Sequence, residues 1–413
     1  MLRSGRVIRS ILFTVVTIVL AFVIFSCIPV TPGTNPKEVT IQTSRHGHIT
    51  NAYVVYAKDG LSGTWVKLTG ANGVYKFTVN DSNGLYSVAV GEPATEYTIK
   101  YAYFFNAKLS ETNFVPIDVG YPTESDAATV TITVPSAYAD KYISVFFHHE
   151  HRFPFASESD SKTYVADYLP KGKADLVIFV GTPWAETGIE KIAIIRDFEL
   201  NEDKVVVITE AQLKDPESAT AFENIGVEWL VGGSSYVFAT PDVKIPSSLK
   251  ADKDLYLINY SDWTNGFEYT EYRKNYPTTT PFATSSINPA DLPTTPVSTS
   301  TTADNLKISL ASYSSGLSEL STILYEVEFY SYSEINDWGW PVKDSSYIVH
   351  MSSGYLASLT NNEYILPRIG GDFAGFDVDV AKNIKVEKPI YVASNKSLKY
   401  FFIPVDGMKV LKH

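Results

Sequence analysis

The stretch Asp175-Leu176-Val177-Ile178-Phe179-Val180-Gly181 decides the fold. Its five central residues are all apolar, and three of them are β-branched, a residue type that favours the pleated conformation. A run this short, closed by glycine, is typical of a strand, and it leaves no polar side chain for a face turned to water. We therefore expect this segment to be a central strand that is buried on both faces.

Working outward, the neighbouring segments have the period of strands that face water on one side. Residues 129–134, Thr-Val-Thr-Ile-Thr-Val, place three threonines on one face and three aliphatic residues on the other. Residues 74–79 alternate in the same way, and the Asn83-Gly84 step that follows them suits a hairpin turn. Only residues 211–226 leave room for a short helix. The predicted fold class is all-β, built from tandem β-sandwich domains of the immunoglobulin-like kind.

Changes in composition divide the chain further. We expect β-sandwich domains at residues 38–120 and 121–215 and a larger β domain at 216–413, after a proline-containing tether at 28–37. In residues 277–302, 18 of 26 are Pro, Ser or Thr. The segment therefore has too few apolar side chains for their burial to offset the conformational entropy lost on ordering. We interpret this segment as a linker or as a long exposed loop within the third domain.

The N-terminal segment has the features of an export signal. Three arginines precede an apolar run over residues 11–25, and Ser26-Cys27 follows. The segment resembles a bacterial lipoprotein signal peptide with its lipobox, which implies cleavage before Cys27 and lipidation of that residue. It also implies a lipid-anchored protein of the cell membrane or outer membrane, facing the periplasm or the exterior. An uncleaved membrane anchor over residues 11–30 is the alternative, since about 20 apolar residues span a bilayer.

Charge and cysteine content narrow the range of partners. The formal net charge is −12, and removing the three signal arginines leaves −15 (−12 minus 3). Such a surface repels phosphate backbones, which argues against nucleic acid as a partner. Cys27 is the only cysteine. An exported mature chain therefore has no internal disulfide and depends on its apolar cores.

A histidine cluster is the first candidate for a metal site. His148, His149 and His151 follow an apolar strand, and in an extended segment His149 and His151 share one face. A His-x-His pair suits zinc, although a zinc site needs three or four protein ligands. The His-Glu-x-x-His pattern of metalloproteases is absent, because Phe153 occupies the required position. The alternative is that these are polar residues at a strand end.

Two aspartates form a second candidate. Asp377 and Asp379 follow the Gly370-Gly371 turn, and they lie on one face if residues 376–380 form a strand. Calcium prefers oxygen ligands of this kind. The alternative is a half-exposed strand with its two valines turned inward.

Two tryptophans form a third candidate. Trp338 and Trp340 flank Gly339 in a polar loop between two predicted strands. Flat indole rings in a loop can stack on sugar rings at a low cost in conformational entropy. The alternative is that one or both rings pack under the loop.

Catalytic motifs and cofactor fingerprints are missing from the sequence. It contains no Gly-x-Ser-x-Gly elbow, phosphate-binding loop or dinucleotide-binding glycine pattern. We therefore expect no cofactor and no enzymatic activity. Together with the sheet pattern, the Cys27 signal resembles exported bacterial surface lipoproteins with tandem immunoglobulin-like or prealbumin-like modules. That resemblance implies a binding or structural role in the cell envelope, with a polysaccharide or a protein as partner. A carbohydrate-binding module and a metal-dependent hydrolase are the alternatives.

Overall fold

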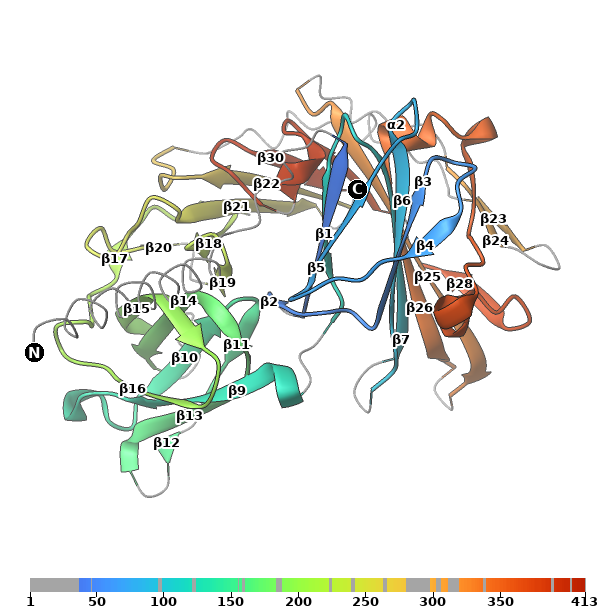
Figure 1. The fold of residues 1–413 in the computed structure, drawn as a ribbon. Helices are drawn as coiled ribbons and strands as arrows, with labels where there is room; N and C mark the ends of the chain where they lie inside the picture. The colour runs from blue at the N-terminus through green and yellow to red at the C-terminus, as the bar shows by residue number, and fades with distance from the viewer. Residues whose placement is uncertain are drawn as a thin grey trace, which may run out of the picture.

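The computed structural model shows an all-β protein, as the sequence predicted (Figure 1). The residues that the structure describes are 37–45, 47–95, 99–120, 124–154, 156–157, 160–182, 188–222, 225–238, 242–262, 266–279, 298–301, 306–310, 319–336, 339–387, 390–401 and 403–412. None of the helices within these ranges is long and apolar enough to cross a bilayer. The predicted signal and Cys27 lie outside the described residues.

One large sheet of 13 strands runs through the molecule. Twelve strands follow one another in the order β19 (Ser235–Phe238), β18 (Gly226–Val231), β21 (Leu255–Asp262), β22 (Phe267–Arg273), β30 (Lys409–Lys412), β29 (Ile390–Ser394), β25 (Thr322–Ile335), β26 (Pro341–Ser352), β7 (Lys100–Lys108), β6 (Leu85–Glu92), β3 (Val54–Asp59) and β4 (Trp65–Lys67). The remaining strand, β28 (Asn383–Val386), pairs with β25. β26 and β7 pair in parallel, which joins the early part of the chain to the late part.

The middle of the large sheet is buried on both faces. Every residue of β6 is buried. In β7, Phe104 packs into the core on one face and Phe105 into the core on the other, because successive side chains point in opposite directions. Strands of this kind require protein on both sides of the sheet.

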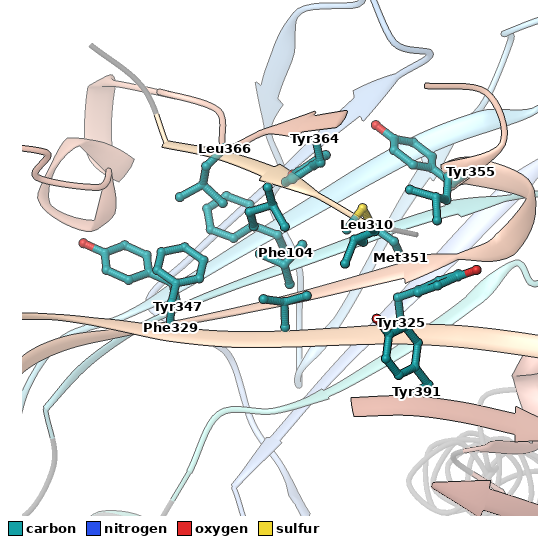
Figure 2. Close-up of a cluster of buried hydrophobic side chains, with 14 of the residues drawn as sticks. Phe104, Leu310, Tyr325, Phe329, Tyr347, Met351, Tyr355, Tyr364, Leu366 and Tyr391 are labelled. Carbon is teal, nitrogen blue, oxygen red and sulfur yellow. The ribbon is translucent and has the colours of Figure 1, made fainter. Parts of the chain in front are cut away.

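Two layers cover the large sheet, one on each face. The first layer consists of β2 (His48–Ile49), β1 (Glu38–Arg45), β5 (Val74–Thr78) and β8 (Phe114–Asp118), whose apolar residues pack around Phe105. The second layer consists of β23 (Ser298–Thr301), β24 (Leu306–Ser309) and β27 (Glu363–Ile365) with α2 (Ser353–Leu356) and the 3-10 helix η6 (Gly371–Phe376). Figure 2 shows the aromatic and aliphatic side chains buried under this second layer.

A separate β-sandwich is formed by residues 127–207. One of its sheets has the order β11 (Glu150–Arg152), β10 (Tyr142–Phe147), β14 (Gly172–Gly181), β15 (Ile189–Leu200), and the other has the order β12 (Ala156–Ser157), β13 (Asp160–Pro170), β9 (Ala127–Thr133), β16 (Lys204–Val207). The central strand predicted from the sequence is β14, and it is buried on both faces. Ile178 lies in the core of the sandwich, and Phe179 packs on the opposite face against Trp229 of the large sheet.

The short helix predicted within residues 211–226 is wrong. The described part of that segment contains turns and β17 (Glu217–Ser218), which pairs with β20 (Val243–Lys244). Lys214 forms a β-bridge with Ile192 of β15, so the edge of the sandwich holds this backbone extended. Within the described ranges, the remaining helical elements are η1 (Glu124–Asp126), η2 (Ser136–Tyr138), η5 (Thr360–Asn362) and η7 (Leu398–Phe401).

The first and the third predicted domains contribute strands to the same sheet. Strands from residues 38–120 and from 216–413 share the large sheet, so those two predicted domains are joined by backbone hydrogen bonds. Within the segment 277–302, the final residues form strand β23, which pairs with β24. The division into three domains remains a prediction.

Candidate functional site

A polar pocket lies where three strands of the large sheet meet. Ser331 of β25 pairs with Ser345 of β26, and Ser345 pairs in turn with Lys100 of β7. These three residues form one row across the sheet and line the pocket as its floor. The next row on the same face is Phe329 with Tyr347, whose rings stack at 4.9 Å (Figure 2). Tyr347 lines the pocket as well.

The wall of the pocket is the loop that follows Arg368. Gly370 and Gly371 have φ angles of +68° and +55°, a left-handed conformation that glycine adopts at little cost. The Asp377 carboxylate then accepts hydrogen bonds from the backbone N–H groups of Ile369 (2.8 Å) and Gly370 (3.0 Å). One side chain therefore closes the loop on itself and positions the wall.

Two phenylalanines of η6 anchor the wall to the sheet. Phe373 and Phe376 are buried in the core under the second cover layer, and the Phe373 ring lies 6.0 Å from the ring of Phe104. Gly91 of β6 leaves the space that Phe376 occupies, because a Cβ atom at Gly91 would lie 2.6 Å from the Phe376 ring. Core packing thus fixes the wall relative to the floor.

The pocket between floor and wall has a volume of about 490 Å³, which is within the range of small-molecule sites. Three cations and two carboxylates line it: Lys100, Arg368, Lys382, Asp377 and Asp379. Serine hydroxyls add groups that can both donate and accept hydrogen bonds. The arrangement can hold a small, highly polar ligand.

One of the three cations is already engaged within the protein. The Lys382 Nζ atom pairs with the Asp344 carboxylate at 3.0 Å. Ser333 donates a hydrogen bond to the same carboxylate at 2.6 Å. Both contacts lower the pKa of Asp344, and the hydrogen bond from Ser333 has the larger effect. Lys382, which lines the pocket, is therefore already paired with a carboxylate of the protein.

The other two cations remain available. Within the described ranges, neither Lys100 nor Arg368 forms an ion pair or a side-chain hydrogen bond. The Asp379 carboxylate accepts one hydrogen bond among the described residues, from the backbone N–H of Ala381 at 3.1 Å. A ligand in the pocket therefore meets two cationic donors and one carboxylate acceptor.

Both aspartates proposed from the sequence as calcium ligands line this pocket. The strand predicted over residues 376–380 is wrong, because Phe376 ends η6 and the residues after it carry no ladder hydrogen bonds. The Asp377 carboxylate accepts hydrogen bonds from the loop backbone at Ile369 and Gly370, whereas the Asp379 carboxylate accepts one from Ala381. Across the described part of the chain, no group of three or more His, Cys, Asp or Glu side chains is arranged to hold a metal ion. The calcium hypothesis stays a prediction.

The three histidines of the predicted metal cluster lie in different surroundings. His148 is buried, with φ of +55°, and burial lowers its pKa to about 3. Its Nε2 atom has no hydrogen-bond partner among the residues that the structure describes. His149 lies 4.0 Å from Asp118 and is half-exposed. His151 stacks on Phe146 at 4.0 Å, and burial lowers its pKa to about 4. These surroundings match polar residues at a strand end.

The tryptophan candidate lies at the tip of the β25–β26 hairpin. Trp340 is 68% exposed, and it does not pack under the loop. Ile335 and Val342 beside it are also exposed, at 62% and 45%. Asn336 holds the turn by accepting the Trp340 N–H on its side chain at 2.9 Å. Trp338 lies outside the described residues.

A second pocket, of about 400 Å³, lies on the outer side of the sandwich. Thr129 uses its backbone N–H to bind Asp203 (2.8 Å) and its hydroxyl to bind Asp167 (3.0 Å). Among the described residues, the lining of this pocket contains no lysine or arginine. Its acidic groups are satisfied within the protein, so it offers less to a ligand than the first pocket.

Sequence reasoning missed the cations of the first pocket. Lys100, Arg368 and Lys382 lie on three separate segments, and none belongs to a motif. The only signal in the sequence was the Gly370-Gly371 turn with the aspartate that follows it. The parallel pairing of β26 with β7, which brings Lys100 to the site, has no local signature.

Comparison with known proteins gives no family assignment. No protein-family model and no curated protein matches the chain. Among solved structures, the chain is similar to the Bacillus anthracis TIE protein, with 13% identity and a TM-score of 0.17, over 57% of this chain and 45% of that one. It is also similar to the CBM26 module of Eubacterium rectale Amy13K in complex with maltoheptaose, with 12% identity and a TM-score of 0.16, over 44% of this chain and 98% of that one.

A third similar structure is the shaft pilin SpaA from Lactobacillus rhamnosus GG, with 7% identity and a TM-score of 0.14, over 42% of this chain and 98% of that one. TM-scores this low carry no argument about function. The chain also spans less than half of the TIE protein.

Proposed function

We propose that this protein is a lipid-anchored, non-enzymatic binding protein of the bacterial cell envelope, and that it holds a saccharide in the pocket beside β26. The observation that carries the proposal is the lining of that pocket. Lys100, Arg368 and Asp379 supply donors and an acceptor, and two serine hydroxyls of the floor supply both. A saccharide presents hydroxyl groups that donate and accept, so it matches this mixture.

The exposed hairpin tip extends the proposed binding surface. Ser345 of the pocket floor and Trp340 of the tip lie on the same hairpin, five residues apart in sequence. Five residues of extended chain span about 17 Å, which is more than one sugar ring. An indole that is 68% exposed offers a flat apolar surface to a sugar face. The tip therefore favours a polymer over a single sugar.

Attachment to the membrane rests on the sequence of the N-terminal segment. A lipid on Cys27 would place the pocket outside the cytoplasm, where envelope polysaccharides occur. The test is expression of the full-length chain and of Cys27→Ala in a bacterial host, followed by detergent phase partitioning. The wild-type protein should enter the detergent phase after signal cleavage, and the variant should persist as an uncleaved precursor. Equal processing and partitioning of the two chains would contradict lipidation.

The binding proposal is tested by closing the pocket. Gly375 lines the pocket, its φ is outside the left-handed region, and a Cβ atom built there meets nothing within 4 Å. Gly375→Phe should therefore fold and fill the cavity. Ala211→Phe, in an exposed turn that follows the last strand of the sandwich, is the matched control. On a glycan array probed with detergent-solubilised protein, binding should be lost in the first variant alone. Absence of binding by the wild-type protein would refute saccharide recognition.

A structural role is the second candidate, favoured by ion pairs that join the sandwich to the rest of the molecule. Arg45 of β1 contacts Glu92 of β6 at 2.9 Å and Asp126 of η1 at 3.0 Å. All three side chains are mostly buried. Such a link restricts movement at the junction, which is useful in a protein that spaces other molecules from a membrane.

A further inference from the structure

We infer that the pocket beside β26 selects saccharides that carry a carboxylate group; this inference rests on the saccharide-binding function proposed above. The chain has an excess of acid, with 46 Asp and Glu against 34 Lys and Arg. Even so, three cations gather in one cavity of about 490 Å³. Cations therefore make up a larger share of the charged groups in the pocket lining than in the whole chain.

The two cations at issue reach the pocket lining from different parts of the chain. Lys100 begins strand β7 and belongs to the floor, in the row with Ser345. Arg368 belongs to the loop that forms the wall, two residues before Gly370. Neither side chain is paired with a carboxylate among the described residues. An anionic group on a ligand that contacts both side chains therefore meets two cations that have no ion-pair partner of their own.

The two carboxylates of the pocket lining accept hydrogen bonds from backbone N–H groups and form no ion pair with Lys100 or Arg368 among the described residues. Both oxygens of Asp377 accept backbone N–H groups from the wall. Asp379 is held by the N–H of Ala381 beyond the loop. The third cation of the pocket, Lys382, is already paired with Asp344. Lys100 and Arg368 are left as the binding groups for an anion.

The chemistry of the two side chains favours a carboxylate on the ligand. A guanidinium presents a planar fork of N–H donors that matches the two oxygens of a carboxylate, and charged hydrogen bonds of this kind are the strong ones. A lysine ammonium adds a point charge without strict geometry. The acidic pocket on the sandwich provides an internal contrast, because Asp167 and Asp203 line it and no lysine or arginine does so among the described residues.

The experiment compares acidic and neutral saccharides on the full-length protein in detergent. A glycan array that carries uronic-acid saccharides and their neutral counterparts provides the first readout. The acidic saccharide with the strongest signal is then reduced at its carboxyl group, which gives a neutral ligand with the same skeleton. Calorimetry should show that reduction weakens binding about tenfold or more, the scale of one charged hydrogen-bonded contact.

Variants of the two cations supply the second readout. Arg368→Gln and Lys100→Gln should each weaken binding of the acidic saccharide about tenfold. After carboxyl reduction, the same variants should bind as the wild-type protein does. Lys253→Gln, on an exposed turn before β21, is the matched control and should change neither affinity. Circular dichroism of each variant confirms that the sheet is retained.

The possible failures are distinguishable. Equal affinity for an acidic saccharide and its reduced form would overturn the charge selection and leave saccharide binding intact. Acidic selectivity that survives both Gln substitutions would overturn the assignment to Lys100 and Arg368. Absence of any array signal would overturn the proposed function, and this inference with it.

Discussion

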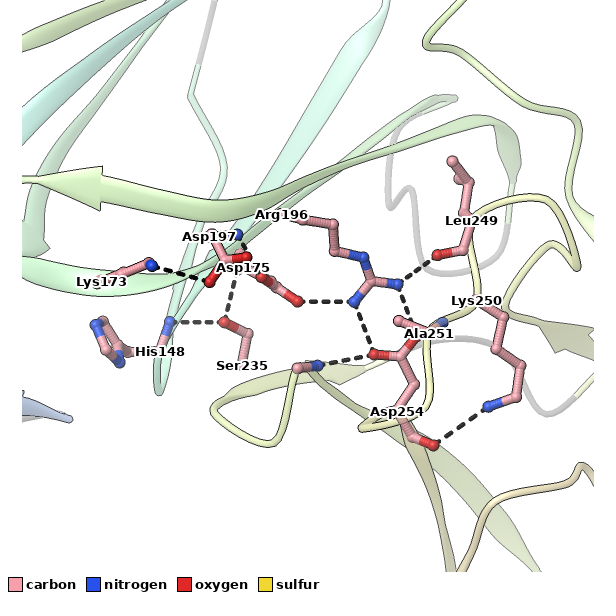
Figure 3. A network of polar contacts seen from close by, with 11 residues as sticks. His148, Lys173, Asp175, Arg196, Asp197, Ser235, Leu249, Lys250, Ala251 and Asp254 are labelled. Atoms are coloured by element: carbon pink, nitrogen blue, oxygen red, sulfur yellow. Dashed lines mark hydrogen bonds and ion pairs between the residues drawn. The ribbon is translucent and has the colours of Figure 1, made fainter. Parts of the chain in front are cut away.

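Arg196 and Asp254 form a bidentate ion pair across the junction between the sandwich and the large sheet (Figure 3). The two guanidinium nitrogens Nη1 and Nη2 each donate to a different oxygen of the carboxylate, both at 2.7 Å. Nη1 also donates to Asp175 of β14 at 2.7 Å, and Nη2 donates to the carbonyl of Leu249. Asp254 is fully buried. A single arginine therefore connects β15 with β14 and with the turn before β21.

Removing one partner of this contact should destabilise the protein strongly. Asp254→Ala leaves the Arg196 guanidinium partly buried without its main partner, at an expected cost of about 3–5 kcal/mol. Lys191→Ala is the control on the same strand, since its ion pair with the exposed Asp215 should contribute less than about 1 kcal/mol. Chemical unfolding with urea measures both. Similar losses in the two variants would contradict a special role for the junction.

The seating of η6 should depend on the absence of a side chain at Gly91. Gly91→Ala introduces a Cβ atom 2.6 Å from the Phe376 ring, and overpacking of this kind typically costs about 1–3 kcal/mol. Because η6 carries the wall of the pocket, saccharide affinity should fall together with stability. Phe376→Leu in the Gly91→Ala background should restore part of both. If the double variant is no better than the single one, the contact is not the cause.

Particular residues show how much of this molecule could be predicted from its sequence. The central strand containing Ile178 was found because its apolar run has no polar face, a signal that is local. Residues 376–380 misled the same reasoning, because the Asp377 side chain bonds to the backbone of its own loop and a strand pattern cannot express that. The pocket could not be predicted, since Lys100 and Ser345 meet only through the pairing of two distant strands.

Acid should destabilise the protein through its buried histidines. The pKa of His148 is lowered to about 3 in the folded protein, against about 6.5 in an unfolded chain. The stabilisation from keeping this imidazole neutral is therefore complete above pH 6.5 and is lost as the pH falls towards 3. The loss is at most about 1.4 kcal/mol for each pH unit. His151, with a pKa of about 4, should add to the effect.

Replacing His148 isolates its share of the acid sensitivity. Asparagine tolerates the left-handed backbone at this position, where φ is +55°, and it does not titrate. The free energy of unfolding of His148→Asn should depend less on pH than that of the wild-type protein between pH 7 and pH 4. Urea titrations at several pH values measure the difference. Parallel pH profiles of the two proteins would show that His148 is not titrating as its burial requires.

The hairpin tip should contribute to binding without contributing to stability. Trp340 is 68% exposed, so Trp340→Ala should change the free energy of unfolding by no more than about 0.5 kcal/mol. If a polymer extends from the pocket to the tip, the variant should bind a long saccharide more weakly than the wild-type protein does. The loss should be about 1–3 kcal/mol, the value for one aromatic ring stacked on one nucleic-acid base. Its affinity for a short saccharide should be unchanged, because a short ligand does not span the distance from Ser345 to Trp340. Equal losses for both lengths would instead place Trp340 at the pocket itself, and unchanged affinity for both would exclude the tip from the binding surface.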